Sequence, residues 1–182
     1  MKKNFLISTG GSGGHVVPAT ILYEHLVQDA NVIISTDIRG LRYLNENDFK
    51  IDIINTPKLN NIFFLPFNLI KILFLIFKSI LILKKREIKT VFSTGGYMSL
   101  PLILGAKLMK LNIYLLEPNQ VLGRANKFYL NFSKKIFCYS EKIKYFPDKF
   151  LEKIVTINPL VRKNNYTLKG SSEKKDMFTL LI

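Results

Sequence analysis

The residues best suited to chemistry lie in a glycine-rich segment near the amino terminus. Residues 10–14 read Gly-Gly-Ser-Gly-Gly, with Ser12 at the centre and His15 directly after. Such a loop between a strand and a helix directs backbone N–H groups and the positive end of the helix dipole at one point, which suits a phosphate or pyrophosphate. The imidazole can donate a hydrogen bond or accept a proton near neutral pH. The alternative is a tight turn with an incidental histidine.

This loop differs from the two common phosphate-binding motifs. Counting from Gly11, Val16 stands where the dinucleotide fingerprint has its third glycine, and no Gly-Lys-Ser/Thr follows as in a P-loop. Pro18 predicts a helix that begins near it, because proline is tolerated in the first helical turn.

Two further polar turns follow strand-like runs later in the chain. Residues 94–97 read Thr-Gly-Gly-Tyr, and Pro101 opens the helix expected after them. Glu117 and Asn119 come after an apolar run and offer a carboxylate and an amide to sugar hydroxyls or to the backbone. The alternative for the second turn is a solvated loop that caps a helix.

Apolar runs alternate with helical patterns in the βαβαβ rhythm of a parallel sheet covered by helices. This predicts an α/β fold with a Rossmann-like, doubly wound parallel sheet. In such a sheet the first and fourth strands are neighbours, so both glycine turns should border one pocket at their carboxyl ends. A short helix is expected at residues 38–45, and strands at residues 5–8, 32–35, 51–54, 90–93, 112–116, 134–139 and 153–157.

The chain of 182 residues is expected to contain one domain and the beginning of another. Residues 1–163 should form the domain with the glycine loops. Residues 164–176 are polar and have the composition of a linker, and residues 177–182 resemble the first strand of a second domain.

The most apolar segment, residues 62–83, contains Lys71 and Lys78, and Lys85 follows at the same seven-residue spacing. No uncharged run approaches the roughly 18 residues that a membrane span requires. The wide apolar surface with a thin basic stripe favours a helix that packs on the sheet and meets an anionic membrane with its outer face. A fully buried core helix with solvated lysines is the alternative.

The charge balance limits the classes of partner. Twenty-seven Lys and Arg against thirteen Asp and Glu give a net charge of +14, which predicts an anionic partner: nucleic acid, a phosphorylated ligand or an acidic membrane. Cys138 is the single cysteine, so no internal disulfide can form. Metal-ligand spacings and a nucleophile elbow are absent from the sequence. The apolar run at residues 5–7 is too short for a signal peptide, so we expect a protein that is not secreted.

Four motifs in order resemble the amino-terminal half of the MurG family. They are residues 10–19 (GGSGGHVVPA), 93–101 (STGGYMSLP), 116–127 (LEPNQVLGRANK) and 158–162 (NPLVR). The resemblance implies the acceptor half of a GT-B glycosyltransferase at the cytoplasmic face of the bacterial inner membrane. It also implies inverting transfer of GlcNAc from UDP-GlcNAc to undecaprenyl-pyrophosphoryl-MurNAc-pentapeptide, without a cofactor or a required metal.

The resemblance also assigns roles to individual residues. His15 is the candidate general base or pyrophosphate ligand, and the remaining candidates bind substrate or contact the membrane. The candidate substrate-binding residues are Gly11, Ser12, Gly13, Gly14, Gly95, Gly96, Tyr97, Glu117, Asn119 and Arg162. The candidate membrane contacts are Phe67, Ile70, Lys71, Phe74, Phe77 and Lys78.

This chain departs from the family pattern at three places. Leu116 and Pro118 replace the usual His and Gln around the glutamate, and one extra residue precedes Arg162. Most of the donor domain lies outside the sequence, so we expect little or no transferase activity from the chain alone. The alternative is the acceptor subunit of a two-polypeptide glycosyltransferase for another lipid-linked sugar, with the donor domain in a separate chain. A nucleic-acid-binding module ranks lower, because the positive charge is mostly Lys beside an apolar helix.

Overall fold

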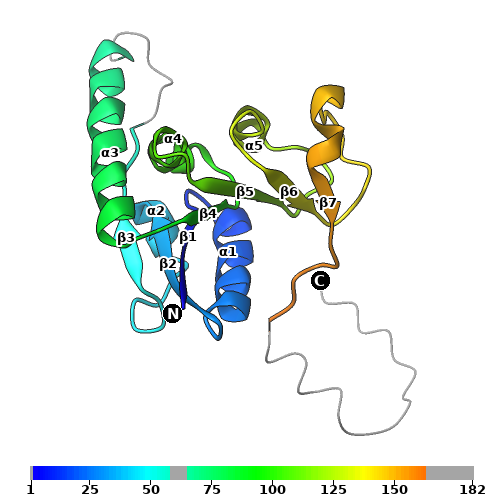
Figure 1. Ribbon diagram of the computed structural model, residues 1–182, viewed down its shortest axis with the longest axis horizontal. Helices are drawn as coiled ribbons and strands as arrows, with labels where there is room; N and C mark the ends of the chain where they lie inside the picture. Colours follow the sequence, from blue (N-terminus) through cyan, green and yellow to red (C-terminus); the bar gives the residue numbers. More distant parts are fainter. Residues whose placement is uncertain (1, 58–64, 163–182) are drawn as a thin grey trace, which may run out of the picture.

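Parallel strands form one sheet in the part of the chain that the computed structural model describes, residues 2–57 and 65–162 (Figure 1). The strands are β1 (Lys3–Ser8), β2 (Ala30–Thr36), β3 (Ile51–Ile53), β4 (Thr90–Ser93), β5 (Asn112–Glu117), β6 (Lys135–Cys138) and β7 (Ile154–Thr156). Their order is β3-β2-β1-β4-β5-β6-β7, and every neighbouring pair is parallel. The carboxyl ends of β1, β4 and β5 therefore meet at one edge.

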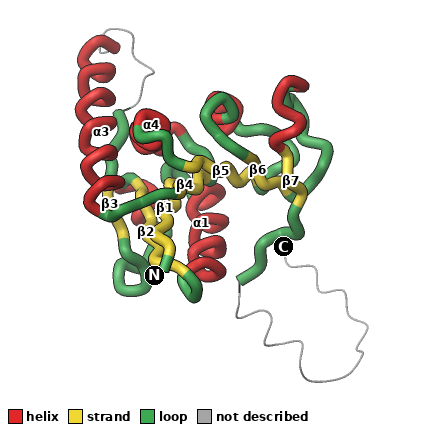
Figure 2. The backbone as a smooth tube through the Cα atoms, viewed as in Figure 1, coloured by secondary structure: helices red, strands yellow, loops and turns green. Residues whose placement is uncertain are grey.

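Helices cover both faces of this sheet. Figure 2 shows α1 on one side of the strands and α4 and α5 on the other. The helices are α1 (Gly13–Leu26), α2 (Ile38–Leu41), α3 (Leu65–Lys85), α4 (Leu100–Leu108) and α5 (Arg124–Tyr129), with 3-10 turns η2 (Tyr97–Ser99) and η3 (Asp148–Lys153).

Two apolar cores result from the alternation of side chains along the strands. Leu6 of β1 joins the core beneath α3 and α4, whereas its neighbour Ile7 joins the core beneath α1. Val91 lies in the first core and Val32 in the second, so the central strands are buried on both faces, as in α/β proteins.

The expected Rossmann-like sheet is confirmed, including the pairing of β1 with β4. The expected start of the first helix near Pro18 is wrong, because α1 begins at Gly13 and Pro18 lies inside it. Proline there removes the N–H that would pair with the carbonyl of Gly14. The expected helix at residues 38–45 ends earlier, at Leu41. The apolar patterns of the sequence predict neither α5 nor η3.

Helix α3 packs along α4 and leaves its other side open to solvent. Gly105 of α4 permits the approach, since a Cβ atom there would lie 3.3 Å from Cβ of Ser79. Ile72 and Leu83 are buried, but only 17% of the most apolar stretch of α3 is buried, so the alternative of a fully buried core helix is wrong. By length and composition, residues 66–85 could cross a membrane, with a mean hydropathy of 2.0.

The expected linker at residues 164–176 and the expected strand at residues 177–182 lie outside the described residues.

Candidate functional site

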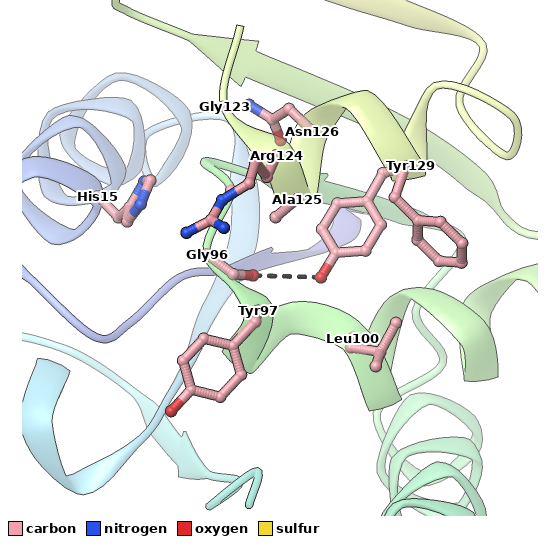
Figure 3. Close-up of a pocket in the computed structure, with 11 residues that line it drawn as sticks. His15, Gly96, Tyr97, Leu100, Gly123, Arg124, Ala125, Asn126 and Tyr129 are labelled. Atoms are coloured by element: carbon pink, nitrogen blue, oxygen red, sulfur yellow. Dashed lines mark hydrogen bonds between the residues drawn. The ribbon is translucent and has the colours of Figure 1, made fainter. Parts of the chain in front are cut away.

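Three loops at the carboxyl edge of the sheet surround a pocket of about 520 Å³ (Figure 3). They follow β1, β4 and β5, the central strands of the sheet. The lining residues come from the start of α1, from the glycine turn after β4, and from α5 and the residue before it. They are His15, Gly95, Gly96, Tyr97, Leu100, Gly123, Arg124, Ala125, Asn126, Phe128 and Tyr129.

The first loop turns sharply and opens the amino terminus of α1 toward this edge. Gly10 and Gly11 have φ angles of 147° and 84°, which L side chains rarely adopt. Ser12 is the N-cap of α1, but its hydroxyl makes no capping hydrogen bond. The first N–H groups of a helix have no partner within the helix. Together with the hydroxyl of Ser12, they leave donors for an anion beside the pocket.

His15 connects the first loop to the second through its ring. Its Nδ1 lies 2.8 Å from the carbonyl oxygen of Thr94. A carbonyl oxygen can only accept, so Nδ1 carries the hydrogen, and Nε2 of the neutral ring is an acceptor. A Nε2 with a free lone pair is the form that a general base requires. This geometry is consistent with the predicted role of His15.

The second loop packs directly on His15 and on the first loop. Gly95 and Gly96 have φ angles of 92° and 81°. A Cβ atom at Gly95 would lie 3.3 Å from Cε1 of His15, and one at Gly96 would lie 3.2 Å from the carbonyl oxygen of Gly10. Larger residues would push the loops apart. The hydroxyl of Tyr129 donates to the carbonyl oxygen of Gly96, and burial raises the pKa of Tyr129 well above its usual range.

Glu117 organises the third loop from beneath and does not line the pocket. Its side chain is 2% exposed. One carboxylate oxygen accepts from the backbone and the side-chain amide of Asn119, at 3.3 and 3.0 Å. The other accepts from the N–H of Gly123 at 2.9 Å and from the amide of Asn126 at 3.0 Å. The carboxylate therefore holds the loop in shape, so of the two expected partners, sugar hydroxyls or the backbone, it bonds the backbone and neighbouring amides here.

Arg124 is a pocket residue that the sequence analysis missed as a ligand contact. Figure 3 shows its guanidinium group extending between His15 and Gly96. The side chain is exposed and lines the pocket with its charge. The motif at residues 116–127 contains it, but the sequence alone does not show that α5 begins at this residue. Asn126 is also new: it is 1% exposed, and its Oδ1 is buried without a hydrogen-bond partner.

Not all predicted site residues line this pocket: His15 does, whereas Gly11, Ser12, Gly13 and Gly14 lie beside it at the start of α1. Asn119 is exposed at the rim of the third loop and bound to Glu117. Arg162 lies elsewhere, because its neighbour Val161 accepts a hydrogen bond from His25 in the last turn of α1. Helix α1 has 14 residues and therefore spans about 20 Å. Arg162 lies near its carboxyl end, whereas the first loop lies at its amino end.

No group of three or more His, Cys, Asp or Glu side chains among the described residues could hold a metal ion. The charged and polar side chains around the pocket are those of His15, Arg124, Asn126, Tyr97 and Tyr129, beside the backbone of the second glycine loop. These groups suit an anionic ligand.

Comparison with known proteins gives a consistent family match. The model of the glycosyltransferase family 28 N-terminal domain matches residues 5–138. The UDP-N-acetylglucosamine–N-acetylmuramyl-(pentapeptide) pyrophosphoryl-undecaprenol N-acetylglucosamine transferase of Pelagibacter ubique is 50% identical over the whole chain, which covers 51% of that relative. The protein of the same name from Rickettsia prowazekii is 38% identical over 90% of the chain, which covers 42% of it.

A solved structure shares the fold. The crystal structure of MurG from Acinetobacter baumannii superposes with a TM-score of 0.72 at 24% identity, covering 94% of this chain and 50% of that one. The chain thus spans about half the length of the curated relatives it matches.

Proposed function

The chain belongs to glycosyltransferase family 28 through its amino-terminal domain, and from that premise we propose that this domain binds the acceptor during GlcNAc transfer. The donor is UDP-GlcNAc and the acceptor is undecaprenyl-pyrophosphoryl-MurNAc-pentapeptide, as the names of the relatives indicate. One observation carries the proposal: three loops from central strands converge on one pocket, where Nε2 of His15 is available as an acceptor.

The acceptor pyrophosphate binds at the amino terminus of α1. The donors there are the first N–H groups of the helix and the hydroxyl of Ser12, and the helix dipole favours the negative charge. The guanidinium of Arg124 adds a charged donor across the pocket. This arrangement fixes the lipid-linked sugar with its hydroxyl group near His15.

The transfer is an inverting displacement in one step. The acceptor hydroxyl attacks C1 of GlcNAc, the bond from C1 to the UDP oxygen breaks, and UDP leaves with that electron pair. Nε2 of His15 takes the hydroxyl proton as the new glycosidic bond forms. The hydrogen bond from Nδ1 to Thr94 keeps the ring in the required tautomer.

We assign residues 1–163 to the acceptor domain, residues 164–176 to a linker and residues 177–182 to the first strand of a donor domain. Arg162 lies next to this linker and away from the pocket, which suits a contact with the nucleotide-sugar once a donor domain is in place.

We propose that helix α3 attaches the domain to the cytoplasmic face of the inner membrane. Its outward apolar side chains include Phe67, Ile70, Phe74 and Phe77, which are 56–68% exposed. Lys71 and Lys78 accompany them and can meet anionic lipid headgroups. Because α3 also packs along α4, we propose that it lies on the bilayer rather than crossing it.

The test is a GlcNAc-transfer assay with UDP-GlcNAc and a short-chain lipid-linked muramyl-pentapeptide. The chain is combined with the carboxyl-terminal half of the Pelagibacter ubique relative, joined in one polypeptide. We expect transfer by the joined protein and a loss of about 100-fold or more in His15→Ala, the size typical of a general base. Gln28→Ala, at an exposed position just after α1, is the control and should retain activity. A His15→Ala protein that is fully active would contradict the proposed role.

A further inference from the structure

A buried carboxylate next to the pocket connects the first glycine loop to the segment after β2. Asp37 is 2% exposed. Its Oδ1 accepts from the N–H of Gly11 at 2.8 Å and from the N–H of Gly40 at 3.0 Å. Its Oδ2 accepts from Nε of Arg39 at 2.8 Å. One side chain thus caps α2 and fixes the turn that leads into α1.

Arg39 extends this connection to the second glycine loop. Its Nη2 donates to the hydroxyl of Tyr97 and lies 2.9 Å from Sδ of Met98. The guanidinium carbon also lies 5.4 Å from the centre of the Tyr97 ring. Tyr97 lines the pocket, whereas Asp37 and Arg39 do not. The two loops are therefore joined by side chains as well as by their direct contact.

The chemistry of this bridge depends on a guanidinium group. Arginine presents several donors in a rigid fork, so it can bond the carboxylate and the phenol at the same time. Lysine carries a single charged nitrogen on a flexible stem and cannot reproduce both directions. The carboxylate, in turn, also accepts from two backbone N–H groups, those of Gly11 and Gly40.

We propose that Asp37 and Arg39 are positioning residues that hold Tyr97 as a wall of the acceptor pocket and keep the two glycine loops in register. The inference rests on the proposed acceptor function of the pocket. Arg39 acts through Tyr97 and does not touch the acceptor. Loss of either member of the pair should loosen the Tyr97 ring and weaken acceptor binding while the sheet stays folded.

The first experiment needs no ligand. The chain is labelled with 3-fluorotyrosine, and the fluorine resonance of Tyr97 is identified among those of the eight tyrosines by its absence in Tyr97→Phe. We expect this resonance to shift in Arg39→Ala, Arg39→Lys and Asp37→Asn. Arg42→Ala is the matched control, because Arg42 follows α2 directly and is exposed. An unchanged Tyr97 resonance in Arg39→Ala would overturn the inference.

The second experiment measures binding of a short-chain lipid-linked muramyl-pentapeptide by calorimetry. We expect Arg39→Ala and Tyr97→Phe each to weaken binding by about tenfold, the loss typical of one hydrogen bond to a charged group. If Arg39 acts through the hydroxyl of Tyr97, the double variant should be no weaker than either single variant. If Arg39 only stabilised the fold, the binding losses of Arg39→Ala and Tyr97→Phe would add in the double variant. Arg39→Ala would then also lower the midpoint of thermal unfolding by the same amount with and without Tyr97→Phe.

The outcomes separate the two proposals. Normal binding by Arg39→Ala, with binding by the unmodified chain intact, overturns the positioning role and leaves the acceptor function standing. No binding by the unmodified chain overturns the acceptor function whatever the fluorine spectrum shows.

Discussion

At the scale of single residues, the pocket depends on hydrogen bonds that leave selected atoms free. The carbonyl oxygen of Thr94 accepts a hydrogen bond from Nδ1 of His15, so Nε2 remains as the basic atom of the ring. The carboxylate of Glu117 accepts four hydrogen bonds, two at each oxygen, so neither oxygen is free for a sugar. Two side chains that look equally reactive in the sequence therefore have different roles, one toward a ligand and one toward the loop.

Replacing Arg124 tests the charged wall of the pocket. Arg124→Ala should weaken binding of the lipid-linked acceptor by about tenfold, because it removes a charge-assisted hydrogen bond to an anion. Calorimetric titration at constant salt measures the change. Lys127→Ala is the control, since Lys127 is an exposed cation on the same helix that does not line the pocket. Equal losses in both variants would show that only the net charge matters.

Replacing Glu117 tests the support beneath the third loop. In the unmodified protein, both oxygens of the Glu117 carboxylate accept from N–H donors. In Glu117→Gln, an NH2 group replaces one of these oxygens and faces the same donors, which should lower the free energy of unfolding by about 1–3 kcal/mol. Denaturant unfolding followed by circular dichroism gives the value. Glu141→Gln, at an exposed position, should change it little. A Glu117→Gln chain as stable as the unmodified one would argue against the loop-holding role.

At the scale of elements, one side of α3 packs on the protein and the other side is exposed. Ser79 and Leu83 are buried, whereas Leu73 and Phe74 are more than 60% exposed. An apolar face of this size, with lysines beside it, is typical of a helix that lies in a membrane interface.

Removing part of that face should release the protein from membranes. Phe74→Ser combined with Phe77→Ser should reduce sedimentation with phosphatidylglycerol vesicles by about tenfold or more, because each buried phenyl ring contributes about 1.5–3 kcal/mol. The control is Leu151→Ser, which alters an exposed apolar residue of η3 near the opposite edge of the sheet (Figure 1). Binding that survives in the double variant would contradict the membrane role of α3.

The sequence predicts the elements with strong patterns and misses those shaped by tertiary contacts. Apolar runs that end in glycine turns locate β1 and β4, and a parallel fold makes them neighbours. In contrast, α5 is six residues long and has no apolar period, so neither the helix nor the position of Arg124 follows from its letters. The burial of Glu117 depends on donors that are placed by the folded loop. Asp37 directly before α2 is a residue type that favours the N-cap, and its side chain does cap this helix.

At the scale of the whole molecule, the stability of the fold should depend on the ionisation of Asp37. Burial alone would raise the pKa of Asp37, but hydrogen bonds from Arg39, Gly11 and Gly40 outweigh it and lower the pKa below 3.8. A carboxyl group with a lower pKa in the folded state adds stability above its unfolded pKa, and that stability is lost as the pH falls through the folded pKa.

Urea unfolding at pH 7 and at pH 3 checks this dependence. The unmodified chain should be more stable than Asp37→Asn at pH 7, and the difference should shrink as the pH falls to 3 and below. A difference that is the same at both pH values would show that the charge of Asp37 does not contribute.

The most direct test of the account is to map where the acceptor binds on this chain. Amide chemical shifts of the labelled protein are recorded while the short-chain lipid-linked muramyl-pentapeptide is added. We predict that the largest changes occur at Gly96 and Arg124, which line the pocket, and at Gly13 and Gly14, which begin α1 beside it. Two results would contradict the claim that the three loops form the acceptor site. One is changes confined to the amino ends of the strands, around Lys3 and Lys89, and the other is no changes at all.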